Sequence, residues 1–465
     1  MRINSIVRDQ NIILIIILIA TTLVLHQSVG ERFWRWDDPI ILKCAIEYTP
    51  WEYFFIPENY RCLTGSHVTP WLLFSFDLDF GLLGLFPQGF YWHHLLSLSL
   101  VSVASFWLLK LYIRPMLAFI GVMLFIVGSP VWVVAQQLMT RHYVEGLIFA
   151  IMALYWYIIS LRKNQMVYAT IGSFFYILAT LAKEIYVPLV GILLFIPETH
   201  LKKRLYASLP YFLWSAAYVF YRNYLLGNFV GGYHSDYSFQ LLVTNFIKAP
   251  DLVIGNGYPE IILIVIWLVS LVLFAKSRWL IVSYSLALFL PLLPLFSGGL
   301  LDYRFLFLPY WSFCILLVLL INHLLTNYRL TLYLFPILVF FTFKVIDVMF
   351  QTQKTVYLYI AEIEEQGKFY WHHTDQEKFL LVTPNLAAIR WYFTGLTWIK
   401  ANVLHQSMPS LFFNTPSLDT RVNNKLVHPN FWQYKPACFC IEKLSAEKLN
   451  TWFLDNQSQN TSQDP

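Results

Sequence analysis

The stretch NIILIIILIATTLVLHQSVG, from Asn11 to Gly30, contains no Asp, Glu, Lys or Arg. A helix rises about 1.5 Å per residue, so twenty such residues can cross the roughly 30 Å hydrocarbon core of a bilayer. Arg2 and Arg8 precede the stretch, and no cleavable signal peptide is convincing. We therefore interpret it as a first transmembrane helix that is kept as an anchor.

The composition extends this interpretation to most of the chain. Of 465 residues, 58% are hydrophobic and 13% are charged, against roughly 25% charged in soluble domains. Aromatic residues make up 18%, as expected for interfacial belts of Trp and Tyr. The net charge of +5 is spread along the chain, which argues against nucleic-acid binding because that needs a concentrated basic face. The sequence predicts an all-α polytopic membrane bundle.

Uncharged stretches of near-spanning length recur as far as residue 343, and we count about eleven transmembrane helices. The predicted spans are 11–30, 80–109 with a membrane part from about Tyr91, 115–140, 146–161, 164–182, 185–197, 205–221, 261–275, 279–301, 305–328 and 330–343. The sixth and the last are short, so ten or twelve remain alternatives.

The charges in the short connections orient these spans. Every second connection is basic, and the positive-inside rule assigns basic connections to the cytoplasm. The residues concerned are Arg2 and Arg8, Lys110 and Arg114, Arg162 and Lys163, Lys202 to Arg204, Lys276 and Arg278, and Arg329. The N-terminus is thus expected inside, and the C-terminus outside: on the periplasmic side of a bacterial plasma membrane, or in the lumen in a eukaryote.

The sequence predicts three parts. Residues 1–345 form a transmembrane module with a structured first outer loop, 31–90, and residues 346–455 form an extracytoplasmic domain before a disordered tail, 456–465. In the second part KFLLVTP, 378–384, is typical of a strand, and LAAIRWYFTGLTWIK, 386–400, of an amphipathic helix. We expect a small α/β appendage there.

Paired carboxylates follow the first helix in WRWDDP, 34–39. Such a pair can act as a general base, bind a divalent cation or cap a helix. Pro39 suits the first position of a helix, which makes Asp38 a natural N-cap and leaves Asp37 as the more available carboxylate. Two solvated carboxylates at a helix start are the plainer alternative.

Ionisable residues also interrupt apolar sequence at the outer ends of later spans. In LAKEIYVP, Lys183 and Glu184 lie where the chain turns at the outer face. Charges at membrane depth are costly and are usually paired or functional, although a Lys–Glu pair at the interface is an alternative. In LLDYRFLFLP, Tyr303 and Arg304 follow Asp302. A guanidinium suits a phosphate because its planar fork bonds two oxygens, but an interfacial anchor paired with Asp302 is equally plausible.

Two further pairs lie on the outer side. They are His93–His94, at the start of the second span, and Arg141–His142, between the third and fourth. Histidines in such places more often pack than bind, and adjacent histidines diverge on a helix, so they indicate a metal only weakly.

The order of these motifs resembles the type C glycosyltransferase superfamily, which includes protein O-mannosyltransferases and bacterial aminoarabinose and mannosyl transferases. The similar segments, covering roughly residues 1–345, are WDDP, Thr69 to Leu100, Ser129 to Tyr157, LAKEIYVPLV and DYRFLFLP. Thr69-Pro70 replaces the family's usual Arg-Pro, and the following helix lacks its common Asn.

The resemblance implies transfer of a sugar from a polyprenyl-phosphate donor to a hydroxyl of a lipid, glycan or protein acceptor on the outer face, with inversion. Asp37 would be the base, and Asp38 would hold a divalent metal ion, a substrate hydroxyl or the helix cap. Lys183 and Arg304, with Arg141, would neutralise the donor phosphate. The substrate pocket would include Glu184, His93, His94, His142 and Tyr303. All these groups are expected to meet at the outer leaflet, among membrane lipids.

Other functions fit part of the pattern. A polymerase or ligase of lipid-linked glycans would use a late loop, such as that with His234 and Asp236. A transporter or flippase without group transfer would often show repeats, and we detect none. A non-catalytic scaffold would bind a partner through its tail.

Cys44 and Cys62 lie in the first outer loop, where an oxidising compartment could join them.

Overall fold

A computed structural model describes residues 2–229, 237–255, 259–274, 278–328, 331–372, 378–381, 386–406, 410–413, 431–435 and 440–444. The loop with His234 and Asp236 lies outside these ranges. By its internal contacts the chain divides into two units. Unit 1 contains Met1–Glu31 and Tyr48–Lys354, and unit 2 contains Arg32–Glu47 and Thr355–Pro465.

Unit 1 is built of helices joined by short turns. In chain order they are α1 (Arg2–Leu25), η1 (Gln27–Glu31), α3 (Glu52–Phe55), α4 (Pro57–Tyr60), α5 (Pro70–Leu83), α6 (Pro87–Leu109), α7 (Pro115–Ile126), α8 (Ser129–Ala135), η2 (Leu138–Thr140), α9 (Arg141–Lys163), α10 (Met166–Ala182), η3 (Glu184–Leu189), α11 (Val190–Leu193), α12 (Leu201–Leu226), α13 (Phe239–Lys248), α14 (Asp251–Ile254), α15 (Pro259–Leu273), α16 (Arg278–Phe289), η5 (Leu290–Leu292), α17 (Leu293–Ser297), η6 (Tyr303–Leu306), α18 (Phe307–Tyr328) and the first part of α19 (Thr331–His372).

Three helical stretches of the described chain are long and apolar enough to cross a membrane: Pro87–Leu109, Leu138–Lys163 and Tyr303–Thr326. α7 and α8 make a fourth if that pair, bent by 63°, is one span. Shorter apolar helices cover Asp9–Leu25, Met166–Ala182 and Glu184–Leu193. The chain is an integral membrane protein, and the count of about eleven spans stays a prediction.

The third predicted span, 115–140, is wrong as a single helix because it breaks at Gly128. A Cβ on Gly128 would collide with the ring of Tyr310 on α18. The Tyr310 hydroxyl donates a hydrogen bond to the carbonyl oxygen of Leu124, at 2.5 Å. Pro130, one residue into α8, has no N–H to continue α7. Tertiary packing and Pro130 therefore separate α7, which ends at Ile126, from α8, which begins at Ser129.

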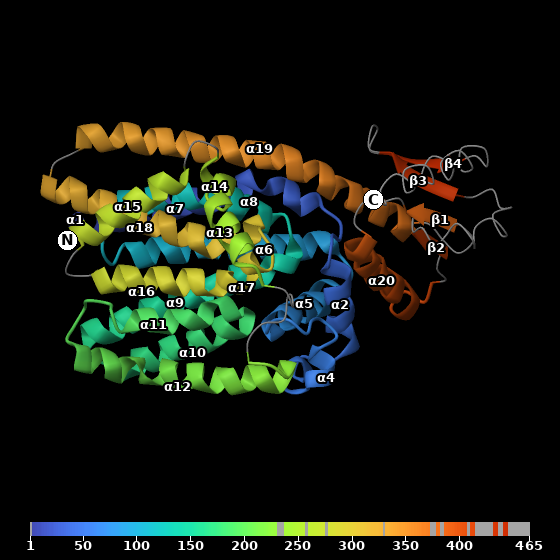
Figure 1. Ribbon diagram of the computed structural model, residues 1–465, viewed down its shortest axis with the longest axis horizontal. Coiled ribbons are helices and arrows are strands. Elements are labelled where there is room, and N and C mark those ends of the chain that lie inside the picture. The colour runs from blue at the N-terminus through green and yellow to red at the C-terminus, as the bar shows by residue number, and fades with distance from the viewer. Residues whose placement is uncertain are drawn as a thin grey trace. The chain divides into compact units, whose positions relative to one another are not determined.

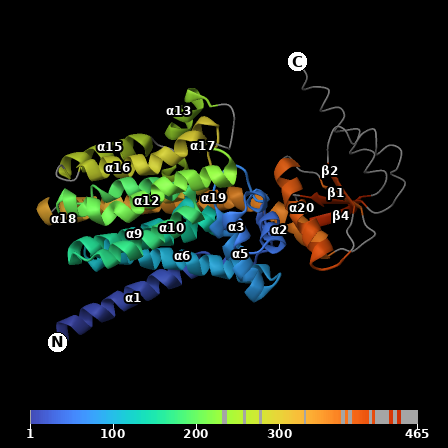
Figure 2. The same ribbon diagram turned by 90° about the horizontal axis from the view of Figure 1, so that it is seen from below.

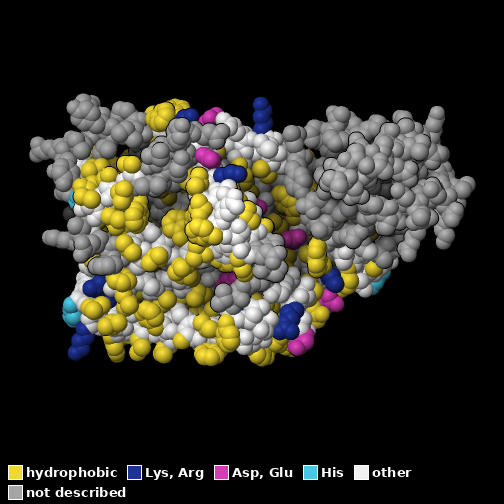
Figure 3. Space-filling view, viewed as in Figure 1, with side chains coloured by type: hydrophobic (Ala, Val, Ile, Leu, Met, Phe, Trp, Pro, Cys, Tyr) yellow, Lys and Arg dark blue, Asp and Glu magenta, His cyan; other side chains and the backbone are white. Residues whose placement is uncertain are grey.

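The helices of unit 1 run side by side in both ribbon views (Figures 1 and 2). α1, α6, α7 and α18 share an apolar core that includes Leu18, Phe106, Val122 and Val318. A Cβ on Gly121 of α7 would press into the side chain of Val318, so glycine lets these two helices approach closely. Hydrophobic side chains also dominate the described surface in Figure 3, with few charged ones between them. That surface suits contact with lipid.

Unit 2 combines α2 (Asp38–Glu47), the last part of α19, α20 (Leu386–Asn402) and a sheet of four short strands, β1 (Lys378–Leu381), β2 (Ser410–Phe413), β3 (Phe431–Lys435) and β4 (Cys440–Leu444). The strand order is β2-β1-β3-β4, with β1 parallel to β2 and β3, and β4 antiparallel to β3. β1 and α20 lie where the sequence predicted a strand and an amphipathic helix. The membership of residues 32–47 in this unit was not predicted.

Glu364 of α19 holds the segment before α2. Its Oε2 accepts hydrogen bonds from Nε and Nη2 of Arg35, at 3.0 and 2.7 Å. Its Oε1 accepts the backbone N–H of Phe33, at 3.1 Å, and lies 2.9 Å from Nζ of Lys368. Burial opposes ionisation, but the charges of Arg35 and Lys368 prevail and lower the pKa of Glu364. The carboxylate is thus the centre of a buried charge-assisted network.

Glu364→Gln should destabilise unit 2 by about 3–5 kcal/mol, because it removes the carboxylate partner of a buried ion pair with Arg35. The thermal melting of the purified protein in detergent measures this, and Glu365→Gln is the matched control because the Glu365 side chain is 42% exposed. The folded-state pKa of Glu364 lies below its unfolded value, so the stabilisation should persist at neutral pH and disappear as pH falls through the folded value. Equal melting temperatures for the two variants would contradict this role.

Cys44 and Cys62 are both disulfide-bonded, whereas Cys314 is a buried free thiol.

Candidate functional site

The paired carboxylates lie at a sharp turn in unit 2. α2 begins at Asp38, and the Asp37 carbonyl accepts hydrogen bonds from the N–H groups of Ile40 and Ile41, at 3.1 and 2.9 Å. Asp37 therefore occupies the N-cap position, and Pro39 is the second helical residue. The prediction that Asp38 is the N-cap and Pro39 the first helical residue is wrong by one position, because the helix starts one residue earlier.

The two carboxylates have different surroundings. Asp38 is fully buried, and its Oδ2 accepts the N–H of Arg35, at 2.9 Å. This bond joins Arg35 to Asp38 across the turn that contains Trp36. The φ of Trp36 is 40°, in the left-handed region. Such a backbone costs a bulky residue about 1–3 kcal/mol and persists only where its surroundings fix it. Asp37 is partly exposed, so of the pair it is the carboxylate that solvent can reach.

Packing within unit 2 fixes that turn. The Tyr392 hydroxyl of α20 donates to the carbonyl oxygen of Trp34, at 2.9 Å. A Cβ on Gly395 would collide with the backbone of Pro39 and Ile40, so α20 touches the start of α2 directly. Together with the Arg35–Glu364 pair, these contacts fix the turn that carries the two carboxylates.

In unit 1 the structure brings Lys183, Arg304 and His142 together. α10 ends at Ala182, and Lys183 adopts an extended backbone before η3. Its side chain is buried, and its ammonium lies over the ring of Tyr143, 5.2 Å from the centroid. Lys183 and Arg304 are close enough for their positive charges to interact.

A pair of histidines lies beside these cations. The rings of His67 and His142 are stacked, with centroids 6.3 Å apart and planes at 27°. Lys183 and Arg304 both act electrostatically on each ring. Burial first, and these positive charges second, hold the pKa of His67 well below its usual value. His67 is therefore neutral at pH 7. Sequence reasoning missed it, because a single histidine in the loop TGSHVTP carries no pattern.

The remaining charges of this cluster are paired. The Glu184 carboxylate accepts a hydrogen bond from Nε of Arg222, at 2.9 Å. Arg304 has its Nε 3.4 Å from Oδ2 of Asp302, and its side chain is 30% exposed. Glu184 therefore forms its ion pair with Arg222 of α12, and not with Lys183 as the alternative interpretation of the sequence proposed. Tyr303 accepts a hydrogen bond from the hydroxyl of Thr352, at 3.3 Å.

Lys183 is the exception. It is 4% exposed, and within the described part of the chain its ammonium has no ion pair and no hydrogen-bond acceptor. Burial lowers the pKa of Lys183 to about 7; the charge of Glu184 counteracts this, and that of Arg304 adds to it. An anion that binds beside this buried ammonium would stabilise its charged form.

A second, buried network contains Arg141 and His93. Nη1 of Arg141 lies 2.6 Å from Oδ2 of Asp79, and its Nη2 donates to the carbonyl oxygen of Phe90, at 2.7 Å. Nδ1 of His93 lies 2.7 Å from the other oxygen of Asp79, and its Nε2 is 3.6 Å from Glu145. Sequence reasoning missed Asp79 and Glu145, although a carboxylate inside an apolar helical stretch is the signal that could have indicated them.

This network ties α5, α6 and α9 to one another. The Glu145 carboxylate also accepts hydrogen bonds from the Trp71 indole, at 2.7 Å, and the Ser75 hydroxyl, at 2.9 Å. The Arg141 guanidinium is completely buried and already neutralised, so the geometry gives it a structural task. His94 is also buried, with Nε2 2.9 Å from the carbonyl oxygen of Val134, as in a packing residue. Direct substrate contact by either remains a prediction.

Asp37 and Asp38 belong to unit 2, while the other predicted site residues belong to unit 1. Over the residues that the structure describes, no group of three or more His, Cys, Asp and Glu side chains is arranged to hold a metal ion. Asp38 is turned towards the Arg35 amide. A divalent metal ion at the carboxylate pair stays a prediction.

Comparison with known proteins gives a likeness of fold. No protein-family model matches the chain, and no curated protein matches its sequence. A crystal structure of ArnT from Cupriavidus metallidurans bound to undecaprenyl phosphate is similar at 12% identity over 91% of this chain and 93% of that one, with a TM-score of 0.48. The apo structure of the same protein is similar at 13% identity over 88% and 94%, with a TM-score of 0.46.

Proposed function

We propose that this chain is a membrane glycosyltransferase that moves a sugar from a polyprenyl-phosphate donor to an acceptor hydroxyl at the outer face of the membrane, with inversion at the anomeric carbon. The resemblance of its motifs to the type C superfamily supports the reaction class. The surroundings of Lys183 support the position of the donor phosphate.

The observation that carries the proposal is a buried cation, Lys183, that forms no ion pair with any described side chain. Lys183 and Arg304 come from distant parts of the chain and lie near the same two imidazoles. Glu184 is engaged by Arg222, so it does not neutralise Lys183 directly. A lipid-linked phosphate would supply the missing charge, and the exposed part of Arg304 could bond two of its oxygens.

The proposed reaction is a single displacement. The acceptor oxygen attacks the anomeric carbon as the bond from that carbon to the phosphate oxygen breaks. The bonding electrons leave with the polyprenyl phosphate, and the acceptor proton passes to a carboxylate. Lys183 and Arg304 stabilise the negative charge that builds on the departing phosphate, and such electrostatic stabilisation is commonly the largest catalytic effect.

Asp37 is the proposed proton acceptor, because it is the more exposed carboxylate of the pair and sits on a fixed turn. An Asp with an ordinary pKa of about 3.9 is a weak base. Its contribution must therefore come from placement, and Asp38 supplies that placement by closing the turn onto Arg35. The acceptor can be a lipid, a glycan or a protein.

Asp37→Asn should lower sugar transfer by about 10²–10⁴-fold, the usual contribution of a general base. The measurement is transfer of label from a polyprenyl-phosphate sugar in membranes that contain equal amounts of each variant. Asp77→Asn is the matched control, because Asp77 is a partly buried acid on α5 outside both networks. Unchanged transfer by Asp37→Asn would remove Asp37 as the base.

The pH dependence tests Lys183. Its pKa of about 7 means that the ammonium is charged below pH 7 and loses its charge above it. Donor kcat/KM should therefore fall as pH rises through about 7. In Lys183→Arg the cation stays charged, so this fall should disappear while activity is retained. A profile that is the same for both proteins would show that Lys183 does not hold the donor phosphate.

A further inference from the structure

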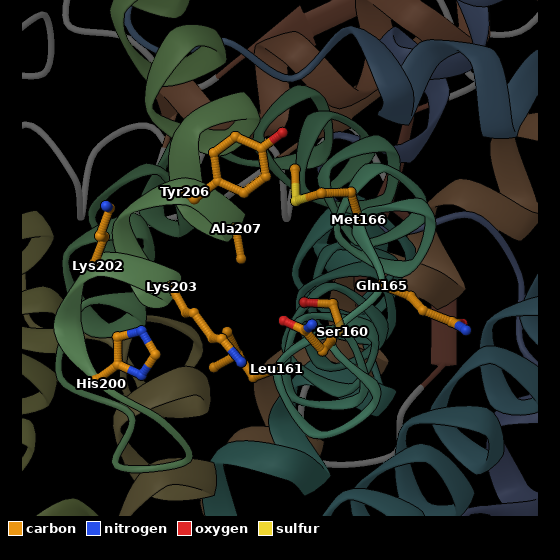
Figure 4. A pocket seen from close by; sticks show the side chains of 10 residues that line it. Ser160, Leu161, Gln165, Met166, His200, Lys202, Lys203, Tyr206 and Ala207 are labelled. Atoms are coloured by element: carbon orange, nitrogen blue, oxygen red, sulfur yellow. The ribbon is translucent and has the colours of Figure 1, made fainter.

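A cavity of about 450 Å³ lies at the opposite end of α9 from Arg141. It opens between the end of α9, the start of α10 and the start of α12 (Figure 4). In this view Lys203 reaches across it towards Ser160 and Leu161, with His200 beside Lys203. The volume is in the range of ligand pockets. None of the residues in the Lys183 cluster lines it.

Two helices begin at this cavity. Gln165 and Met166, the N-cap and first residue of α10, line it, and so does His200, the N-cap of α12. Neither N-cap side chain makes a capping hydrogen bond, and neither first turn contains an acidic residue. The first N–H groups of a helix lack intrahelical acceptors, and the helix dipole is positive there. Both ends therefore favour an anion in the space between them.

The side chains add positive charge to the same place. Lys202 and Lys203 line the cavity, and neither forms an ion pair with any described residue. The nearby acid, Glu198, is bound by Arg162, with Nε and Nη2 at 3.0 and 2.9 Å from its two oxygens. Cations in the first turn of α12 are also unfavourable next to the positive end of the dipole. A bound anion would offset the repulsion between these lysines and the positive end of the helix dipole.

Apolar side chains lead away from the cavity along α12. Leu201, Leu205, Leu209 and Leu213 recur at intervals of four residues, so they share one helix face, and all are between 49% and 62% exposed. Tyr206, which lines the cavity, is also exposed. A ligand with a phosphate at one end and hydrocarbon at the other matches this arrangement of charge and apolar surface.

We propose that this cavity binds the phosphate head group of an anionic membrane lipid, with acyl chains lying along the exposed leucines of α12. Lys202 and Lys203 would contact the phosphate together with the first amides of α10 and α12. The site is separate from the Lys183 cluster and would lie in the leaflet on which the basic connections are found.

Native mass spectrometry of the purified full chain with added phosphatidylglycerol tests this. A lysine near an anionic lipid surface contributes about fivefold in affinity. Lys202→Gln/Lys203→Gln should therefore bind phosphatidylglycerol roughly 25-fold more weakly, and Lys202→Arg/Lys203→Arg should retain binding. Lys110→Gln/Arg114→Gln is the matched control, because it removes two cations from another basic connection and neither residue lines this cavity. It should bind like the wild type.

Several results would overturn the proposal. Equal weakening by the Lys202/Lys203 and Lys110/Arg114 variants would mean unspecific attraction to the bilayer. Full displacement of the lipid by an equal concentration of inorganic phosphate would make the cavity a site for free phosphate. Unchanged binding by the Lys202→Gln/Lys203→Gln protein would exclude the cavity. Melting temperatures of all variants report whether each is folded.

Discussion

The constraint on which this structure depends is that a charge taken out of water must find a counter-charge or strong hydrogen bonds. Three buried arginines satisfy it with carboxylates: Arg35 with Glu364 at 2.7 Å, Arg141 with Asp79 at 2.6 Å, and Arg222 with Glu184 at 2.9 Å. Each pair joins segments far apart in sequence. These three ion pairs thus hold distant segments of the apolar chain together.

Lys183 stands out against these pairs. It is as buried as they are, yet it forms no ion pair with a described residue, and its ammonium lies over the ring of Tyr143. Its pKa of about 7 reflects the cost of burial. A site that binds an anionic lipid head group needs such an unsatisfied cation, because a fully paired one would have to break its pair first. The proposed function follows from this contrast.

Sequence alone predicted an integral membrane protein and singled out three residues that lie near one another in the structure. The unusual residues Lys183, Arg304 and His142 stood out because charged or paired polar groups are rare in apolar sequence, and they do meet. Their partners did not stand out. Arg222 and Asp79 form ion pairs with residues tens of positions away along the chain, so their roles depend on the fold. Arg35 and Glu364 are 329 positions apart in the sequence. At the break near Gly128, Pro130 is a local helix-breaking signal, whereas no local pattern could indicate the contact with Tyr310.

Binding of sugar-free polyprenyl phosphate to the purified protein tests the central claim most directly, because it isolates the phosphate site from the chemistry. If Lys183 and Arg304 hold the phosphate, Lys183→Gln/Arg304→Gln should bind it about tenfold or more weakly than the wild type, as expected for the loss of hydrogen bonds to a charged group. Lys110→Gln/Arg114→Gln should not differ from the wild type. Equal affinity in all three proteins would contradict the account.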